Sequence, residues 1–448
     1  MEHAPKAVQT LQSALEAVDE LDLLSTTADL DRFSRDAYDY SPVLEEQFGS
    51  CRAQLVVRPH TVAAVMAVAS ACAQASVPLT LRGAGTGNYG QCVPLQGGVV
   101  MLMGELRAVR ALDPTTGVVE VECGCLLKDL DRELASQGRQ LRLMPSTWRS
   151  ASVGGFIAGG SGGIGSVRWG FLRDPGHLLG LEMVTLEPKP RLLQLDASDA
   201  EALNHAYGTN GIITALTLSS APRVDWQEVC VDCSDWRTAV TLMQRCQQAA
   251  VELFLCTLLD QAIVAGLPPW SGPATATHRL LLLVSPDGVS TVERLASTVG
   301  GTMRCLGAET SRQGNGLREL SWNHTTLHMR QQDSAWTYLQ MLLPQPEQPV
   351  LEALSKDWGD DLLWHLEGVR HAGAARLAAI PLVRWRSQDA LERLINQCRS
   401  LGAVIFNPHV ITVEDGGLGI IDGDQVAAKQ RHDPGGLLNP GKLKGWTS

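Results

Sequence analysis

The chain lacks a long apolar run and an excess of positive charge, and each absence excludes a class of protein. No run approaches the roughly 18 residues that a membrane helix needs, and residues 280–284 fit a buried strand. Lysine and arginine number 37 against 48 acidic residues, so the net charge is −11 and no nucleic-acid-binding surface is expected. Residues 1–19 lack the basic and apolar regions of a secretory signal. We therefore expect a cytoplasmic protein without membrane insertion and without a nucleic-acid partner.

The cysteines lack the spacing of a disulfide framework or of a metal site. They number 11, an odd count, and are scattered over most of the chain, which is typical of reduced thiols in a cytosolic protein. Cys230 and Cys233 have C-x-x-C spacing, but they lie in a predicted strand without a second pair or a glycine-rich turn. We predict no metal site.

Glycine is concentrated in one stretch, where eight glycines fall between Gly154 and Gly170. Each glycine costs chain entropy and adds no packing, so this density is not expected in an ordinary helix or strand. Phe156, Ile157 and Trp169 are interleaved with the glycines, and a flexible linker would not contain them. The stretch predicts backbone that approaches a large flat or anionic cofactor with its N–H groups.

A second glycine loop, residues 83–90, follows a predicted strand at residues 78–81. Its glycines, with Glu105 at about the expected distance, resemble a dinucleotide-binding Rossmann fingerprint. That fingerprint requires a helix after the glycines, whereas here Pro94 and the pair Gly97-Gly98 lead to another predicted strand. We therefore predict a loop that holds a pyrophosphate with consecutive backbone N–H groups.

Four segments carry a family resemblance: Arg82-Gly-Ala-Gly-Thr-Gly, the stretch from Ser152 to Gly163, residues 208–214 and residues 433–442. In that order they resemble the pyrophosphate loop, the second flavin loop, the segment beside the adenine and the C-terminal signature of the FAD-linked oxidase family. This is the FAD-binding PCMH-type or vanillyl-alcohol oxidase superfamily, and the chain is similar to its glycolate-oxidase-subunit-like flavoproteins.

The resemblance implies FAD as the cofactor. The residues that it places against FAD are Arg82, Gly83, Ala84, Gly85, Thr86, Gly87, Asn88, Pro145, Ser146, Ser152, Val153, Gly154, Gly155, Gly159, Gly162, Gly163, Gly211, Ile212, Thr214 and Asn439. Members that bind flavin covalently often carry a histidine where this chain has Thr86, and the residues just before Ser152 include no cysteine. We therefore expect non-covalent FAD, with Cys92 as the one thiol close to the first loop in sequence.

The resemblance, together with the alternation of predicted helices and strands, implies an α+β protein with two lobes. The expected parts are an N-terminal helical segment at residues 1–47 and an FAD-binding PCMH-type domain at residues 48–222. An α/β substrate (cap) domain is expected at residues 223–410, followed by a C-terminal segment, residues 411–448, that returns to the FAD domain.

Histidines are the first candidates for a catalytic base because they titrate near neutral pH. His409 lies in a Pro-His sequence that resembles a site near the flavin of sugar-oxidising relatives, or it is a capping or loop histidine. His324 lies among polar and aromatic residues suited to a cleft wall. His328 would share its helix face, more often as a surface pair than as a metal pair. Arg384 and Arg386 alternate on a predicted strand, where they would clamp a carboxylate or form a solvated face.

Two further observations qualify the chemistry. His365 and Glu367 point the same way on a predicted strand, and we interpret His365 as a satisfied core histidine. The chain lacks the His-x-Gly-Asp-Gly-Asn-x-His motif that the glycolate and D-lactate dehydrogenase branch carries near its metal and substrate. This absence argues against a metal-assisted 2-hydroxy-acid dehydrogenase but does not exclude an acidic substrate.

We expect an FAD-dependent oxidoreductase that oxidises a small alcohol, hydroxy acid or sugar-like substrate by hydride transfer to flavin N5. Two alternatives stay open: an NAD(P)-dependent dehydrogenase that uses the first loop as a Rossmann turn, and a catalytically silent flavin-binding subunit. The expected partner is a small-molecule substrate, and the expected assembly is a homo-oligomer or a multi-component dehydrogenase. The sequence does not identify the electron acceptor.

Overall fold

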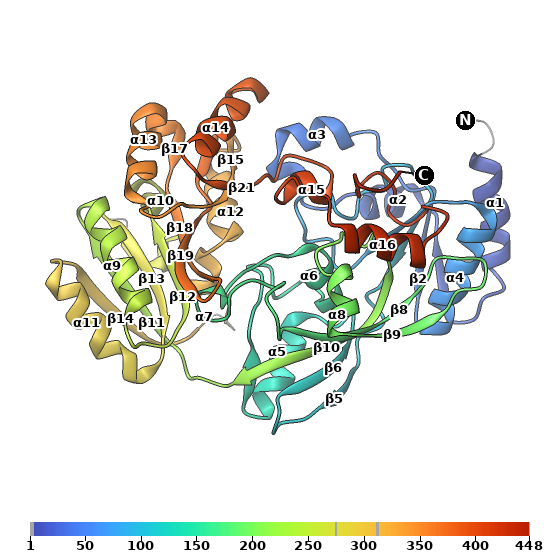
Figure 1. Cartoon of the computed structure of the whole chain (residues 1–448), viewed down its shortest axis with the longest axis horizontal. Helices are drawn as coiled ribbons and strands as arrows, with labels where there is room; N and C mark the ends of the chain where they lie inside the picture. Colours follow the sequence, from blue (N-terminus) through green and yellow to red (C-terminus); the bar gives the residue numbers. More distant parts are fainter. Residues whose placement is uncertain (1–3, 274–275, 311–312, 448) are drawn as a thin grey trace.

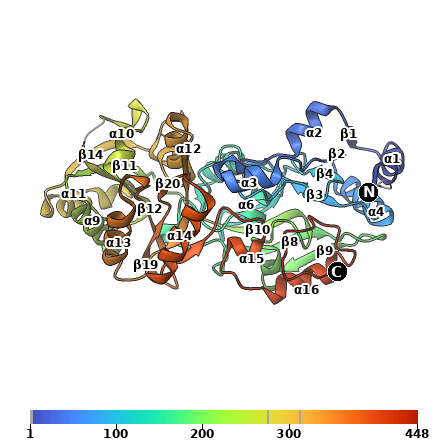
Figure 2. The same cartoon turned by 90° about the horizontal axis from the view of Figure 1, so that it is seen from above.

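Two lobes lie side by side in the computed structural model, which describes residues 4–273, 276–310 and 313–447 (Figure 1). The chain crosses from the first lobe to the second between β10 (Ile212–Pro222) and β11 (Gln227–Cys233). It returns to the first lobe after β21 (Val404–Phe406), the last strand of the second lobe. Figure 2 shows α1 (Ala4–Leu15) and α16 (Gly423–His432) on the same lobe.

Short apolar strands build a four-stranded sheet at one end of the first lobe. Its strands, in spatial order, are β1 (Leu21–Leu24), β2 (Leu55–Pro59), β4 (Val99–Leu102) and β3 (Leu79–Arg82). β2 and β3 both run parallel to β4, so a crossover is required between β2 and β3. Helix α4 (Val62–Ala75) supplies it, capped by the Thr61 hydroxyl, which accepts from the Ala64 N–H at 3.2 Å. Because β3 and β4 end at the same edge, the first glycine loop leaves the sheet there.

The second sheet of the first lobe is antiparallel throughout its pairings. Its strands are β5 (Val109–Leu112), β6 (Val118–Glu122), β10, β8 (Leu178–Val184) and β9 (Leu192–Asp196), with β7 (Arg139–Leu141) on the far end of β10. The long strand β10 pairs with β6 along one edge and with β8 along the other. It contacts α6 of the glycine-rich stretch, and it ends where the chain crosses to the second lobe. Further helices of this lobe are α2 (Thr27–Phe33), α3 (Pro42–Phe48), α5 (Leu127–Ser136), α6 (Val153–Gly159), α7 (Ser166–Trp169), α8 (Ala197–Ala200) and α15 (Val413–Gly416).

The second lobe packs helices against an eight-stranded antiparallel sheet, and we refer to it as the cap. The strands are β14 (Thr302–Ala308), β11, β13 (His278–Val284), β12 (Leu253–Leu259), β18 (His365–His371), β19 (Ala374–Ala379), β16 (Gln340–Leu342) and β21. A small sheet joins β15 (Trp336–Tyr338), β20 (Leu382–Arg384) and β17 (Leu362–Leu363). The helices are α9 (Trp236–Gln248), α10 (Gln261–Ala265), α11 (Val289–Thr298), α12 (Asn323–Gln332), α13 (Gln348–Trp358) and α14 (Gln388–Ser400).

Two local expectations from the sequence differ from the structure. Within the supposedly helical segment at residues 1–47, β1 is a strand, because it pairs with the free edge of β2. The glycine-rich stretch was expected to contain no ordinary helix, yet α6 and α7 form inside it. Ser152 starts α6 by accepting the Gly155 N–H at 3.2 Å, and tertiary packing offsets the entropy cost of the glycines.

The C-terminal segment returns to the first lobe, as the family resemblance implied. Leu79 donates its N–H to Leu437 O at 2.9 Å and accepts the Asn439 N–H at 2.7 Å, so the segment runs alongside β3. In α16, Lys429 pairs with Asp433 at 2.7 Å and donates to Thr209 O at 2.8 Å, with both charged side chains buried. The α+β, two-lobed architecture is therefore confirmed.

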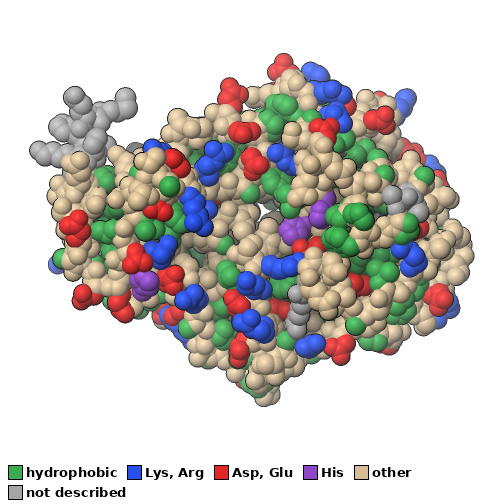
Figure 3. Space-filling view, turned by 180° about the vertical axis from the view of Figure 1, so that it is seen from behind, with side chains coloured by type: hydrophobic (Ala, Val, Ile, Leu, Met, Phe, Trp, Pro, Cys, Tyr) green, Lys and Arg blue, Asp and Glu red, His purple; other side chains and the backbone are tan. Residues whose placement is uncertain are grey.

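The surface carries mixed charge. On the face shown in Figure 3, acidic and basic side chains are interspersed rather than gathered into one basic patch. Within the described part of the chain, no helix combines the length and apolarity needed to cross a bilayer.

Candidate functional site

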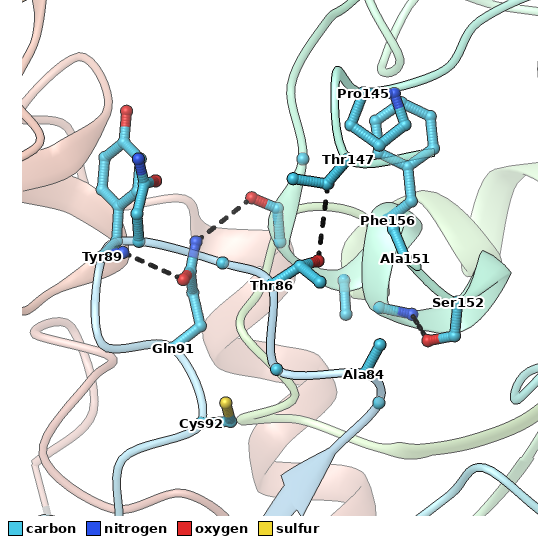
Figure 4. A pocket seen from close by; sticks show the side chains of 18 of the residues that line it. Ala84, Thr86, Tyr89, Gln91, Cys92, Pro145, Thr147, Ala151, Ser152 and Phe156 are labelled. Atoms are coloured by element: carbon cyan, nitrogen blue, oxygen red, sulfur yellow. Dashed lines mark hydrogen bonds between the residues drawn. The ribbon is translucent and has the colours of Figure 1, made fainter. Parts of the chain in front are cut away.

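A cavity of about 290 Å³ lies between the first lobe and the cap. Its first-lobe wall comes from three segments within residues 83–92, 145–163 and 205–213, and Figure 4 shows side chains of the first two converging on it. The cap contributes Trp322, Asn323, His324, Leu327 and Gln340. A concave site at a lobe interface is where cofactors and substrates commonly bind.

The first glycine loop presents unsatisfied backbone donors to this cavity. Among the described residues, the N–H groups of residues 83–88 have no hydrogen-bond partner within the chain. Residues 83–88 line the cavity and are half-buried or exposed, so their free N–H groups are available to an anion bound there. The loop therefore fits the pyrophosphate of FAD.

The second glycine segment packs closely against the end of the second sheet. A Cβ on Gly154 would lie 2.6 Å from Cys123 Cβ and 3.0 Å from Cys123 O, which is too close for any side chain. A Cβ on Gly83 would lie 2.3 Å from Ser152 Oγ, so the two glycine loops also contact each other. Gly154 is required by its close approach to the main chain and Cβ of Cys123, and Gly83 by its close approach to the Ser152 hydroxyl.

The third segment contains left-handed backbone. His205 and Tyr207 have φ values of 55° and 53°, and Gly208 follows at 63°. The His205 imidazole contacts Gly160 O at 2.8 Å through Nδ1, which joins this segment to the end of the glycine-rich stretch. All three residues line the cavity.

The C-terminal segment is hydrogen-bonded to the end of the first glycine loop and the residues after it. Lys442 donates from Nζ to the carbonyl oxygens of Gly90, Gln91 and Val93 at 2.6, 2.8 and 2.6 Å. Burial lowers the pKa of Lys442 to about 8. Asn439 donates from Nδ2 to Gln91 O at 2.8 Å and Tyr207 O at 2.6 Å, so it joins two walls of the cavity without lining it.

An acidic group lies beneath the same loop. Asp36 Oδ2 accepts from Cys92 N at 3.4 Å and lies 3.7 Å from Cys92 Sγ, while its buried Oδ1 has no partner among the described residues. Burial raises the pKa of the Asp36 carboxyl to about 6, although Lys442 and Arg82 oppose this. Arg82 donates to Arg35 O and, at 3.3 Å, to Cys92 Sγ.

The cap wall carries the groups suited to acid–base chemistry. His324 lies at the start of α12, and its Nδ1 is 3.4 Å from Glu319 Oε2. The other oxygen, Glu319 Oε1, accepts from Arg149 of the first lobe at 2.9 Å. Loop and cap also meet directly, because Asn88 donates to Tyr338 Oη at 2.7 Å and Tyr89 Oη to Gln340 Oε1 at 2.6 Å.

Most of the residues predicted to contact FAD line the cavity. These are Gly83, Ala84, Gly85, Thr86, Gly87, Asn88, Pro145, Ser146, Ser152, Gly154, Gly155, Gly159, Gly162, Gly163 and Gly211. Five others, Arg82, Val153, Ile212, Thr214 and Asn439, are absent from the lining. Their side chains are buried: Thr214 donates to Glu182 Oε1 at 2.8 Å, and Val153 and Ile212 belong to the core. These five residues are therefore buried next to the cavity walls rather than exposed in the cavity itself.

Of the predicted catalytic residues, only His324 lines the cavity. His409 is buried against Ser41 Oγ and Tyr338 O, each 2.8 Å from a ring nitrogen, and burial lowers its pKa to about 4. Arg384 lies on β20 and pairs with Asp333 at 3.0 Å. The structure therefore does not bring His409 or Arg384 into the cavity lining, and the polar atoms of both are engaged by other groups.

Sequence reasoning missed several groups around the cavity. Glu319 lies five residues before His324, but a carboxylate and a histidine at this spacing form no recognised motif. Arg149 and Gln340 lie far from them along the chain, so no local spacing would have joined these residues. His365 is a buried core residue, as expected, with Nε2 2.7 Å from Glu367 Oε1, but its buried Nδ1 has no hydrogen-bond partner among the described residues, so it is not fully satisfied. The Rossmann alternative is not supported, because β3 is followed by the loop and by β4, with no helix between them in this fully described segment.

Comparison with known proteins agrees with this geometry. Residues 53–191 match the family model of an FAD binding domain, a range that contains both glycine loops. The D-lactate dehydrogenase of Anaerostipes hadrus is 29% identical over 184 residues, 39% of this chain and 38% of that protein. Glycolate oxidase subunit GlcD of Escherichia coli strain K12 is 28% identical over 178 residues, 38% of this chain and 35% of that protein. These alignments span well under half of each relative.

Two comparisons extend over most of the chain. Glycolate oxidase subunit GlcD of Bacillus subtilis strain 168 is 22% identical over 431 residues, 87% of this chain and 88% of that protein. A solved structure of alkyldihydroxyacetonephosphate synthase superposes with a TM-score of 0.72 and 16% identity, over 98% of this chain and 85% of that one. This structural likeness shows the shared fold. The match of residues 53–191 to the FAD binding domain is the finding that supports FAD as the cofactor and the family resemblance.

Proposed function

The chain carries the FAD-binding domain of the FAD-linked oxidases, and from this premise we propose that it oxidises the CH–OH group of a small alcohol, hydroxy acid or sugar-like substrate. The observation that carries the proposal is the composition of the cavity. One wall offers unpaired backbone donors for the cofactor, and the opposite wall offers a histidine paired with a carboxylate. The residues that would bind the cofactor and the histidine that would remove the proton therefore line the same cavity.

In this proposal, the N–H groups of residues 83–88 bind the pyrophosphate, and the second glycine segment lies along the rest of the cofactor. When bound, FAD supplies the acceptor for the hydride that leaves the substrate carbon. His324 takes the hydroxyl proton, so the substrate loses one hydride and one proton and becomes a carbonyl compound. Trp322 and Leu327, which also line the cavity, exclude water from the reacting carbon.

Non-covalent attachment of FAD belongs to this proposal. The two thiols that line the cavity are Cys92 and Cys123, and burial raises the pKa of each to about 12. A thiol in this state is a poor nucleophile. Thr86, which replaces the histidine of covalent relatives, lies 3.5 Å from Thr147 Oγ1 across the loops (Figure 4).

The relatives suggest a substrate class and an assembly. Their names refer to D-lactate and glycolate, and other relatives are probable D-2-hydroxyglutarate dehydrogenases of rice. We therefore propose small 2-hydroxy acids as the first substrates to test. Because two relatives are named as subunits, a homo-oligomer or a multi-component dehydrogenase in the cytoplasm is part of the proposal, and light scattering of the purified protein would measure its assembly.

The first experiment is an absorption spectrum of the purified protein before and after acid precipitation. Bands at roughly 370 and about 450 nm that move to the supernatant would demonstrate dissociable FAD. Colour left in the pellet would demonstrate a covalent link. A protein that takes up no flavin would contradict the proposal.

The second experiment is anaerobic bleaching of the flavin with glycolate, D-lactate, D-2-hydroxyglutarate and a neutral sugar. His324→Ala should retain FAD and slow bleaching by roughly 10²- to 10⁴-fold, the usual contribution of a general base. His60→Ala, at an exposed histidine of the first lobe, is the control and should bleach at the normal rate. A reducible flavin that no substrate bleaches would support the silent-subunit alternative.

A further inference from the structure

Glu319 occupies a junction between the two lobes. It lies in a short 3-10 turn, Leu317–Leu320, and its side chain is almost fully buried. Arg149 of the first lobe donates to Oε1 from Nε at 3.2 Å and from a terminal nitrogen at 2.9 Å. His324 Nδ1 lies 3.4 Å from the second oxygen, Oε2. One carboxylate therefore links the cofactor lobe to the histidine of the cap.

Arg149 and His324 keep the Glu319 carboxyl ionised. Burial acts to raise the pKa of this carboxyl, but the hydrogen bonds and charges of His324 and Arg149 outweigh burial and lower it below its ordinary value. Glu319 is thus a carboxylate at neutral pH, with Arg149 bound at Oε1 and the His324 Nδ1 atom 3.4 Å from Oε2.

The backbone around His324 is fixed independently. Trp322 has a φ of 49° and donates its N–H to Glu367 Oε1 at 2.7 Å. Glu367 is itself buried and accepts from Thr257 Oγ1 at 2.7 Å. One turn later, His328 Nε2 contacts Glu319 O at 2.8 Å. Since the main chain is held on both sides, the remaining freedom of His324 is rotation of its side chain.

We propose that Glu319 is a positioning residue, which turns His324 Nδ1–H toward its own carboxylate and leaves Nε2 to the cavity, while Arg149 holds Glu319 from the first lobe. The inference rests on the proposed function in one respect, that His324 acts on substrate. Without Glu319 an imidazole would exchange its proton between both nitrogens, and Nε2 would be protonated part of the time. Glu319 also stabilises the imidazolium that forms when the proton is taken up.

The groups around His324 make two substitutions informative. Among the described residues, the charged and titratable groups near it are Glu319, Arg149 through Glu319, His328, and Glu367 through Trp322. Glu319→Gln replaces a carboxylate oxygen by an amide group, so both N–H forms of the His324 imidazole should be populated. Arg149→Met removes the group that holds Glu319 and should weaken the preference for the Nδ1–H form to a smaller degree.

The test is two-bond ¹H–¹⁵N NMR of the FAD-loaded protein labelled with ¹⁵N-histidine, with His324→Gln identifying the His324 signal. The ¹⁵N shifts should show the Nδ1–H form in the native protein and a mixture of both forms in Glu319→Gln. Glu309→Gln is the matched control, because Glu309 is another partly buried carboxylate paired with an arginine, Arg318, at 2.5 Å. It should leave the His324 signal unchanged.

Each outcome has one meaning. If neither Glu319→Gln nor Arg149→Met changes which nitrogen of His324 carries the proton, the positioning role is overturned. If Glu319→Gln does not fold, Arg149→Met alone decides, and an unchanged Nδ1–H form overturns the role. If the NMR changes occur as expected but His324→Ala bleaches its flavin normally, the proposed catalytic function fails while the Glu319–His324 pair stands.

Discussion

The two walls of the cavity differ in what they present. Every glycine of the described lining belongs to the first lobe, where backbone N–H groups and close backbone contacts form the surface. The cap contributes no glycine to the described lining and instead presents the side chains of Trp322, Asn323, His324, Leu327 and Gln340. Backbone can hold a cofactor that is common to a family, whereas side chains determine which proton is taken and which substrate fits. Cofactor binding and substrate chemistry are thus divided between the lobes.

The largest effect is expected when a side chain is added to a glycine of the first-lobe wall, where backbone forms most of the surface. Gly154→Ala places a Cβ against the main chain of Cys123, which cannot move aside as a flexible side chain would. We expect FAD content after purification to fall at least about tenfold or the protein to unfold, because strain of this kind costs roughly 1–3 kcal/mol or more. Absorbance at about 450 nm relative to protein measures the content.

Gly104→Ala is the control for this prediction. Gly104 also lies in the first lobe, but a Cβ there meets nothing within 4 Å. Its FAD content should equal that of the native protein. Normal flavin content in Gly154→Ala would mean that the close approach to Cys123 does not shape the cofactor wall.

A smaller effect is expected from the buried acid beneath the first loop. The pKa of Asp36 is about 6 in the folded protein and near 4 when unfolded, so the folded state binds more protons between these values. Folding stability should therefore fall as pH rises from about 4 to about 6, by at most about 3 kcal/mol. Asp36→Asn removes this loss and should raise the melting temperature above pH 6, with no difference near pH 4.

Thermal unfolding across this pH range measures the effect, with Asp19→Asn as the control, since Asp19 is exposed. This result sharpens the comparison of the two cavity walls, because it tests whether the stability of the first-lobe wall depends on the charge of Asp36. An Asp36→Asn protein that melts below the native protein at pH 7 would contradict the burial argument.

The smallest effect concerns the other histidine that the sequence suggested. His409→Ala leaves the Ser41 hydroxyl and Tyr338 O without their partner, which should cost about 1–3 kcal/mol of stability. FAD content and the rate of flavin bleaching should stay at native levels. Slowed bleaching with normal FAD content would show that His409 takes part in the reaction. It would contradict the assignment of cofactor binding and substrate chemistry to separate walls.

The cofactor wall was largely predictable from sequence because its physical requirement is written in adjacent residues. A loop of consecutive N–H donors needs glycines at short spacing, as in residues 83–88, and a close backbone approach needs them again at Gly154 and Gly163. The error lay in their conformation: α6 forms because Ser152 caps it and Cys123 packs against it. Arg82 and Asn439 were assigned to FAD, but they bond to neighbouring loops instead.

The catalytic wall could be predicted only in part, since its partners are joined by no local pattern. His324 was among three candidates. Nothing in the sequence separated it from His409, because the hydrogen-bond partners of His409 depend on how β15, the start of α3 and the loop after β21 meet.

Amino-acid order thus indicated, through glycine spacing, a loop that approaches a large cofactor, and the resemblance to the FAD-linked oxidase family implied FAD and the two-lobed α+β fold. The lobes had to pack before Arg149, Glu319 and His324 formed one chain of contacts. Charge and hydrogen bonding act over a few ångströms in space, however far apart the residues lie in the chain.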